Sequence, residues 1–179
     1  MATILLVRHG ETDWNVQRRV QGHSDTPLNA TGRAQAEELA RTLEGEPIDA
    51  VYSSDLERAT ATAAIVAKRL GLDVKLEPAL REKHFGTWEG LTDTEVFERF
   101  PEAQPGRWGD GETSEEMSER VIRAIERIAG HHPDGRALVV THDGPVRALL
   151  RACGEPGDFV ANCHVCAIEV RDGLLRAVD

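Results

Sequence analysis

The hydrophobic positions of the chain follow two different periods in alternation. Short, nearly continuous apolar runs are typical of buried strands, and they predict strands at 3–7, 49–52, 73–76, 136–141, 165–170 and 174–178. Apolar residues at helical spacing predict helices at 32–44, 54–70, 93–99 and 113–129. This alternation predicts an α/β fold, a three-layer sandwich in which a mostly parallel central sheet carries helices on both faces.

Local signals indicate where several elements begin and end. Ser54-Asp55-Leu56-Glu57 and Thr113-Ser114-Glu115-Glu116 each fit a capping box at the start of a helix. Gly45 and Gly71 follow helical patterns and are expected to end them. Arg171-Asp172-Gly173 separates the last two apolar runs as a hairpin turn would, so one edge of the sheet is expected to be antiparallel.

The pattern loosens between Arg81 and Gly111. Glycine and proline interrupt this stretch repeatedly, and only 93–99 within it has helical spacing. Loose segments inside compact domains are often functional. We therefore expect a single domain over 1–179, with a lid-like segment at about 81–111.

Charge limits the partners that the chain can have. Its 179 residues include a hydrophobic share of 40%, enough for a compact core, and carry a formal net charge of −10. Such a balance argues against nucleic acid and against an anionic membrane, whereas a few arginines in one cleft can still attract a small anion. The first apolar run is too short for a signal peptide, and no apolar stretch is long enough to span a bilayer. We expect a cytoplasmic protein, either a monomer or a homodimer.

Three cysteines are too few, and odd in number, for a disulfide scaffold. Cys163-His164-Val165-Cys166 has a spacing that metal sites use. On a strand, however, Cys163 and Cys166 would point to opposite faces, and no fourth ligand is evident. Packing in the core is the favoured interpretation for these cysteines.

Chemistry-bearing residues follow three of the predicted strands. Arg8-His9-Gly10 comes directly after the first strand, Arg58 lies in the helix after the second, and His142 follows the fourth. Ligands of open α/β sheets bind at the carboxyl ends of the strands, so these residues are expected to form one anion pocket. Arginine forks match phosphate oxygens, and nearby cations favour a neutral, nucleophilic His9. The Gly10 carbonyl could accept a proton from the second ring nitrogen of His9.

A leaving alkoxide needs a proton, and Glu82 is the candidate donor. It follows the third predicted strand, where a bound phosphate would favour its protonated form. Once deprotonated, the same group could draw a proton from an attacking water. Glu11 and Glu89 are the alternative acids, since a carboxylate between Arg81 and Lys83 is commonly solvated.

The segment 6–15 resembles the signature of the histidine phosphatase superfamily, the group that includes the cofactor-dependent phosphoglycerate mutases. Similar blocks follow at 21–28, 52–63, 80–90, 111–113 and 139–144. The resemblance implies that His9 is phosphorylated and that Glu82 donates the proton. The remaining residues that it implies are a phosphate clamp of Arg8, Arg58 and His142, and a substrate mouth of Asn15, Gln21 and Gly22. No metal and no cofactor are expected, because the arginines supply the stabilising charge.

The sequence of residues 85–91 resembles that of the phosphatase branch of this family, which includes the α-ribazole phosphatases. The mutases carry an inserted segment after the acid block, and a shorter lid favours hydrolysis. We therefore expect a phosphomonoester hydrolase that acts on a small phosphorylated metabolite, such as α-ribazole phosphate or a sugar phosphate. Mutase-type transfer and a non-catalytic module that binds phosphorylated ligands are the alternatives, and intact His9 and Glu82 favour an enzyme.

Other aromatic and histidine residues have less certain places. Trp14, Trp88 and Trp108 are expected either to wall the cleft or to pack in the core. His23 and His84 are expected at the surface rather than in the pocket.

Overall fold

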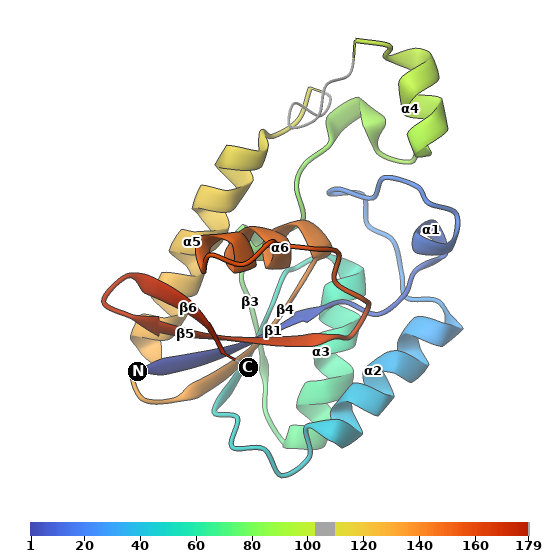
Figure 1. Ribbon diagram of the computed structural model, residues 1–179. Helices are drawn as coiled ribbons and strands as arrows, with labels where there is room; N and C mark the ends of the chain where they lie inside the picture. Colours follow the sequence, from blue (N-terminus) through green and yellow to red (C-terminus); the bar gives the residue numbers. More distant parts are fainter. Residues whose placement is uncertain (103–109, 179) are drawn as a thin grey trace.

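The computed structural model describes residues 1–102 and 110–178. Within them, a six-stranded sheet forms the centre of the fold, in the spatial order β3-β2-β4-β1-β5-β6 (Figure 1). The strands are β1 Ala2–Arg8, β2 Ala50–Ser53, β3 Val74–Leu76, β4 Arg136–Thr141, β5 Val165–Arg171 and β6 Leu174–Val178. The helices are α1 Asp13–Val16, α2 Ala30–Thr42, α3 Glu57–Leu70, α4 Asp93–Arg99, α5 Ser114–His131 and α6 Asp143–Ala152, with short 3-10 turns η1 Pro78–Leu80 and η2 Gly86–Trp88.

The direction of the strands divides the sheet into two parts. The pairs β1–β4, β2–β4 and β2–β3 are parallel, whereas β5 pairs antiparallel with β1 and β6 antiparallel with β5. Arg8 of β1 lies opposite Thr141 of β4. The residues that follow these two strands therefore leave the sheet side by side, at its carboxyl end.

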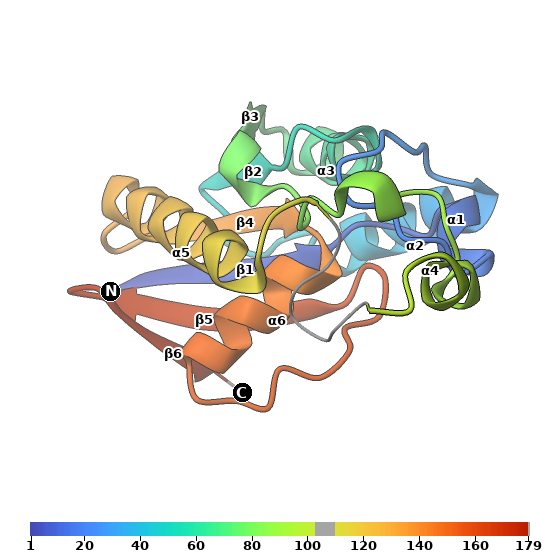
Figure 2. The ribbon, with the colours of Figure 1, turned by 90° about the horizontal axis from the view of Figure 1, so that it is seen from above.

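Helices cover both faces of the sheet (Figure 2). On one face, Ile4 and Leu6 of β1 belong to an apolar cluster with residues of α5 and α6. On the other face, Leu5 and Val7 belong to a cluster with residues of α2 and α3. Successive side chains of a strand point to opposite faces, so burial on both sides explains the continuous apolar run. The expected three-layer sandwich with an antiparallel edge is confirmed.

One predicted helix start is wrong. α3 begins at Glu57, and its N-cap is Leu56, which makes no side-chain capping bond, so Ser54 does not cap this helix. The Ser54 backbone N–H still donates to the Val140 carbonyl at 3.0 Å, which continues the ladder beside β4 and prevents a helix from starting there. The second predicted capping box, at Thr113, is present.

α2 lies two residues earlier than predicted. Its N-cap is Asn29, whose side chain accepts a hydrogen bond from the Gly32 N–H. The helix ends at Thr42 rather than reaching Gly45, whereas Gly71 does end α3, in the left-handed conformation with φ 68°. Asn29 is a good N-cap, which explains the earlier start.

The segment expected to be lid-like contains α4 as predicted and also η2, which the pattern did not indicate. An isolated bridge between Arg19 and Thr92 ties the start of α4 to the loop after α1, and Figure 1 shows α4 beyond the carboxyl end of the sheet. Residues 103–109, Trp108 among them, lie outside the described residues. The lid therefore stays a prediction.

Cys163 does not lie on a strand as expected, because β5 begins at Val165. Its backbone has a positive φ of 56°, and its N–H donates to the Arg8 carbonyl at 2.8 Å. The argument from opposite strand faces was therefore wrong for this residue. All three cysteines are free thiols that pack against the apolar clusters, as the favoured interpretation expected.

Candidate active site

The carboxyl end of the parallel strands brings two histidines together. His9 follows β1 and His142 follows β4, and their ring centroids lie 5.1 Å apart at an interplanar angle of 61°. Arg58, in the first turn of α3, donates from Nε to Nε2 of His9 at 3.3 Å. His9 is 3% exposed, and Arg58 and His142 are 0% exposed. The predicted cluster therefore exists, and it is almost fully desolvated.

The hydrogen bonds of His9 define which of its nitrogens is free of a proton. Nδ1 donates to the carbonyl of Gly10 at 2.7 Å, as expected, so Nε2 carries the lone pair. Burial lowers the pKa of His9 well below its ordinary 6.5, and the Arg58 guanidinium adds to the effect. Gly10 is required here, because a Cβ at this position would lie 2.5 Å from the carbonyl oxygen of Gly32.

Arg58 is held by the loop that precedes α2. Its two terminal nitrogens donate to the carbonyls of Gly22 at 2.8 Å and Ser24 at 2.9 Å. Burial lowers the pKa of Arg58 to about 10, so the guanidinium remains charged at neutral pH. These bonds hold the guanidinium of Arg58 next to Nε2 of His9.

Arg8 reaches the same cluster from the end of β1. One terminal nitrogen donates to the Val160 carbonyl at 2.6 Å and lies 3.8 Å from the Asp143 carboxylate. The guanidinium also lies over the Phe159 ring, 4.8 Å from its centroid. Its Nε is buried and has no hydrogen-bond partner among the residues that the structure describes.

His142 presents a second unpartnered nitrogen. Its Nε2 lies 2.9 Å from Oγ of Ser54, while its Nδ1 is buried without a partner in the described part of the chain. Burial lowers the pKa of His142 well below 6.5, and Arg58 and His9 lower it further. His142 is therefore neutral in the folded protein, and its single ring proton can be on either Nδ1 or Nε2.

Glu82 lies in a hollow at the start of α6, the helix that follows His142. Its carboxylate accepts from the backbone N–H of Lys83 at 2.8 Å and of Gly144 at 3.2 Å. Burial raises the pKa of Glu82 above its ordinary 4.5, in spite of these two bonds. The hollow has a volume of about 370 Å³ and is lined by Val20, Glu82, Lys83, Phe85, Asp93, Ser114, Met117, Asp143, Gly144, Arg147 and Arg151.

The two alternative acids have structural partners instead. Glu89 accepts hydrogen bonds from the backbone of His23, Ser24 and Phe85, so its carboxylate joins the loop before α2 to the segment after Glu82. Glu11 accepts from the Asn29 side chain at 2.9 Å. The Glu82 carboxylate instead lies at the start of α6, the helix that follows His142.

The residues expected at the substrate mouth make bonds within their own loop. Asn15 Oδ1 accepts from the Thr12 backbone N–H at 3.0 Å in the capping box of α1. Gln21 Oε1 accepts from Thr12 and Thr26 hydroxyls, and the Gly22 carbonyl accepts from Arg58. They therefore shape the loop that holds Arg58, and contact with a substrate stays a prediction.

Three residues near the site were not singled out from the sequence as site residues. Ser54 contacts His142, and Asn162 donates to the His9 carbonyl at 2.8 Å. His23, which was expected at the surface, is half-buried, and its Nε2 lies 2.8 Å from the Glu82 carbonyl oxygen. A serine at a strand end was the one available signal, and it was interpreted as a helix cap.

The tryptophans that the structure describes differ in their roles. Trp88 is buried and its ring lies 5.8 Å from that of Phe100, so it packs in the interior. The ring of Trp14 lies beside Gly90, on the loop side of the site.

The described residues show neither a metal cluster nor a membrane-spanning helix. Among the described residues, no group of three or more His, Cys, Asp or Glu side chains could hold a metal ion. No helix in the described part of the chain has the length and apolar character needed to cross a membrane.

The chain is similar to known proteins over almost its whole described length. Residues 4–178 match the histidine phosphatase superfamily (branch 1). The chain is 42% identical to phosphoglycerate mutase-like protein 4 of Arabidopsis thaliana, over 96% of this chain and 81% of that protein. It is 41% identical to a metal-independent phosphoserine phosphatase of the same plant, over 94% of this chain and 76% of that protein. The structure of a putative α-ribazole-5'-P phosphatase from Escherichia coli superposes with a TM-score of 0.87 at 30% identity, covering 99% of this chain and 94% of that one.

The chain belongs to the histidine phosphatase superfamily. The expected family, its fold and the phosphatase class of enzyme are thereby confirmed. Its relatives carry both phosphatase and mutase-like names, so the comparisons support phosphoryl-transfer chemistry in general.

Proposed function

We propose that the chain hydrolyses phosphomonoesters through a phosphohistidine on His9, with Glu82 as the general acid and base. The observation that carries the proposal is a set of unsatisfied buried groups around one nucleophile. His9 has its lone pair on Nε2, and Nε of Arg8 and Nδ1 of His142 are buried with no hydrogen-bond partner among the described residues. Unpaired buried donors are costly, and an anion in the pocket would satisfy them.

In the first step, His9 Nε2 attacks the phosphorus of the ester. The N–P bond forms as the P–O ester bond breaks, and the electron pair of that bond goes to the ester oxygen, which takes the proton of Glu82. The raised pKa of Glu82 suits this role, because the group keeps its proton at higher pH than an ordinary carboxyl. The Gly10 carbonyl, bound to Nδ1–H, stabilises the positive charge that develops on the ring.

The phosphoryl oxygens would lie between the cations. Arg58 and Arg8 carry the charge that stabilises the transition state, and the long 3.3 Å bond from Arg58 to His9 can be exchanged for one to a phosphoryl oxygen. Since two buried guanidinium groups supply this charge, the proposed reaction needs no metal ion.

In the second step, the Glu82 carboxylate draws a proton from a water molecule, whose oxygen attacks the phosphorus. The N–P bond breaks and its electron pair returns to Nε2, which restores neutral His9 and releases inorganic phosphate. Glu82 is again protonated, so the cycle closes without any other reagent.

The leaving group would occupy the hollow of about 370 Å³ that adjoins Glu82. Its lining combines apolar side chains with the charged groups of Lys83 and Arg147, which suits a small polar metabolite rather than a macromolecule. The names of the relatives supply test substrates of this size, namely phosphoserine and α-ribazole 5'-phosphate.

The experiment that tests the proposal measures phosphate release by the wild type, His9→Ala and His131→Ala in EDTA. The panel contains phosphoserine, α-ribazole 5'-phosphate, 3-phosphoglycerate and a sugar phosphate. His131 is an exposed histidine at the other end of α5 and is the matched control. We expect release by the wild type and the control, and an acid-labile phosphoprotein that His9→Ala does not form. An isomerised phosphoglycerate without free phosphate would favour a mutase, and binding without turnover would favour a binding module.

A further inference from the structure

The side chain of Ser54 contacts His142, one residue of the proposed phosphate clamp. It follows β2, and its side chain and that of His142 are both 0% exposed. Its Oγ lies 2.9 Å from Nε2 of His142, across 88 residues of sequence. The backbone N–H of Leu56 points at the same oxygen from 3.3 Å.

The hydrogen-bond capacity of this hydroxyl decides which way the bond runs. A serine hydroxyl has one hydrogen to donate and two lone pairs to accept with. The Leu56 N–H uses a lone pair, and among the described contacts of Ser54 Oγ, His142 Nε2 is the other one. If Nε2 carried the proton, Oγ would accept twice and its own hydrogen would be buried with no acceptor in the described structure, which is unfavourable.

We infer that Ser54 is a positioning residue, whose hydroxyl donates to Nε2 of His142 and thereby holds this histidine in its Nδ1–H tautomer. The unpartnered Nδ1 of the neutral His142 ring then carries the proton and can donate a hydrogen bond to a bound anion. The tautomer follows from the geometry alone, whereas its role as a phosphate donor rests on the proposed function.

The choice of tautomer matters because His142 is neutral. A protonated imidazole would offer N–H groups on both sides, whatever its neighbours. Burial and the Arg58 guanidinium lower the pKa of His142 and so disfavour the protonated imidazole. With the proton on Nε2, Nδ1 would present a lone pair to the phosphoryl oxygens and would repel them.

The tautomer can be measured without any substrate. Nitrogen-15 NMR of histidine-labelled wild type distinguishes a protonated Nδ1 from a protonated Nε2 in each neutral ring. We expect His142, assigned by its loss in His142→Gln, to be protonated at Nδ1. A wild-type ring protonated at Nε2 would overturn the inference.

Variants then test the cause. In Ser54→Ala, we expect His142 to lose its single tautomer and the affinity for inorganic phosphate to fall about tenfold, as for one lost bond to a charged group. Ser54→Thr keeps the hydroxyl and is expected to restore both. Ser53→Ala is the matched control, because Ser53 is equally buried and donates to the Ser54 carbonyl instead of to His142.

Two results would contradict the inference even where all variants fold with native circular dichroism. One is an unchanged His142 tautomer in Ser54→Ala. The other is an equal loss of phosphate affinity in Ser53→Ala. A wild type that fails to hydrolyse phosphomonoesters would refute the proposed function, but it would leave the tautomer and the phosphate titration as independent tests.

Discussion

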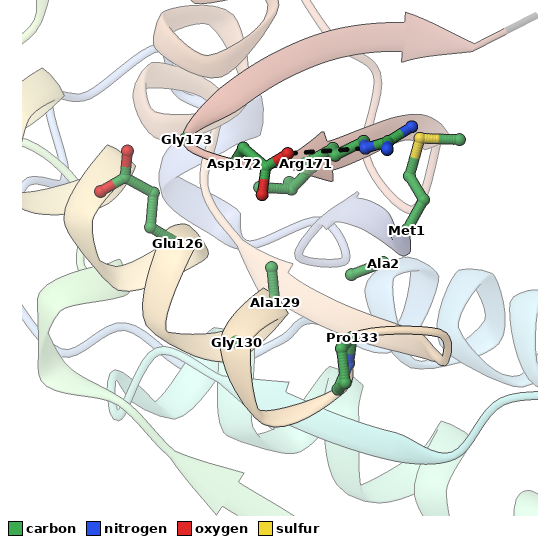
Figure 3. A pocket seen from close by; sticks show the side chains of 10 residues that line it. Met1, Ala2, Glu126, Ala129, Gly130, Pro133, Arg171, Asp172 and Gly173 are labelled. Carbon is green, nitrogen blue, oxygen red and sulfur yellow. Dashed lines mark ion pairs between the residues drawn. The ribbon is translucent and has the colours of Figure 1, made fainter.

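Two hollows lie at opposite ends of the same sheet, and the larger one lacks the features of a catalytic site. The amino-end hollow has a volume of about 580 Å³ (Figure 3), against about 370 Å³ for the hollow beside Glu82. Its lining residues are Met1, Ala2, Glu126, Ala129, Gly130, Pro133, Val170, Arg171, Asp172 and Gly173. The larger of these two hollows is therefore not the one that Glu82 lines.

The difference between the two hollows lies in solvent and in helix direction. Arg171 and Asp172 form an ion pair at 3.5 Å, with side chains 76% and 86% exposed, so water screens their charges (Figure 3). The last turn of α5 ends at this hollow, where the helix dipole is negative. At the carboxyl end, α3 and α6 begin, and Nε of Arg8 and Nδ1 of His142 are buried without a partner among the described residues. Desolvation and unpartnered buried nitrogens, not volume, mark the end where we propose that the reaction takes place.

The largest expected contrast comes from one arginine at each end. Arg58→Ala should lower kcat/KM by about 10³-fold, because it removes a buried transition-state charge. Arg58→Lys should recover little of this loss, since an ammonium lacks the planar fork. Arg171→Ala should stay within about twofold of the wild type. Steady-state kinetics on the best phosphomonoester checks all three, and an unimpaired Arg58→Ala would break the comparison.

A carboxyl group at each end gives the next contrast. Glu82→Gln should lower kcat by about 10²-fold for alkyl phosphates and much less for aryl phosphates, whose leaving groups need no proton. Because the pKa of Glu82 is raised, wild-type kcat should fall as pH rises through that pKa, and the variant should lack this limb. Glu126→Gln should behave as the wild type. Equal losses for alkyl and aryl esters would show that Glu82 is not the acid.

The buried histidines predict a smaller effect, on stability. The pKa values of His9 and His142 lie well below 6.5 in the folded state, so between those values and 6.5 the unfolded chain binds more protons. The free energy of unfolding should therefore reach its full value above pH 6.5. Below pH 6.5 it should decrease as the pH falls, by about 1.4 kcal/mol per pH unit for each histidine. Urea unfolding of His142→Gln should show a flatter dependence between pH 6.5 and 5.5, whereas the exposed His131→Gln should not.

The smallest effect is expected in the amino-end hairpin. Asp172 has a φ of 51°, a left-handed conformation that asparagine adopts as readily as aspartate. Asp172→Asn removes the exposed ion pair and should change the free energy of unfolding by less than about 0.5 kcal/mol, with kcat/KM unchanged. Thermal unfolding and the phosphatase assay check this. A loss of activity here would mean that the amino-end hollow takes part in function.

The hydrophobic pattern was sufficient to predict the strands of the sheet and the helices that cover its two faces. β4 and β6 have the predicted bounds, since each is a short apolar run next to turn residues. The site residues that follow strands were also predictable, because the topology of a parallel sheet brings His9 and His142 to one edge. Ordinary helix signals were correct at Thr113 and misleading at Ser54, where a strand ladder competes with a cap.

The supporting residues could not be predicted in the same way. Ser54 meets His142 across 88 residues, and Asn162 meets the His9 carbonyl across 153. Contacts so distant leave no periodic trace in the sequence. They depend on how two loops close over a strand end, which tertiary packing decides.

The position of β1 in the sheet has a consequence for the synthesis of the chain. β1 is made before every other strand, yet its two neighbours are β4 and β5, which begin at Arg136 and Val165. While the intervening chain is translated, both edges of this apolar strand lack their native partners and are available to other nascent chains. Pairing across such sequence separations is slow, so folding waits for the last third of the chain. The loop after β1, which carries the proposed nucleophile His9, therefore reaches its final position only after β4 and β5 have been made.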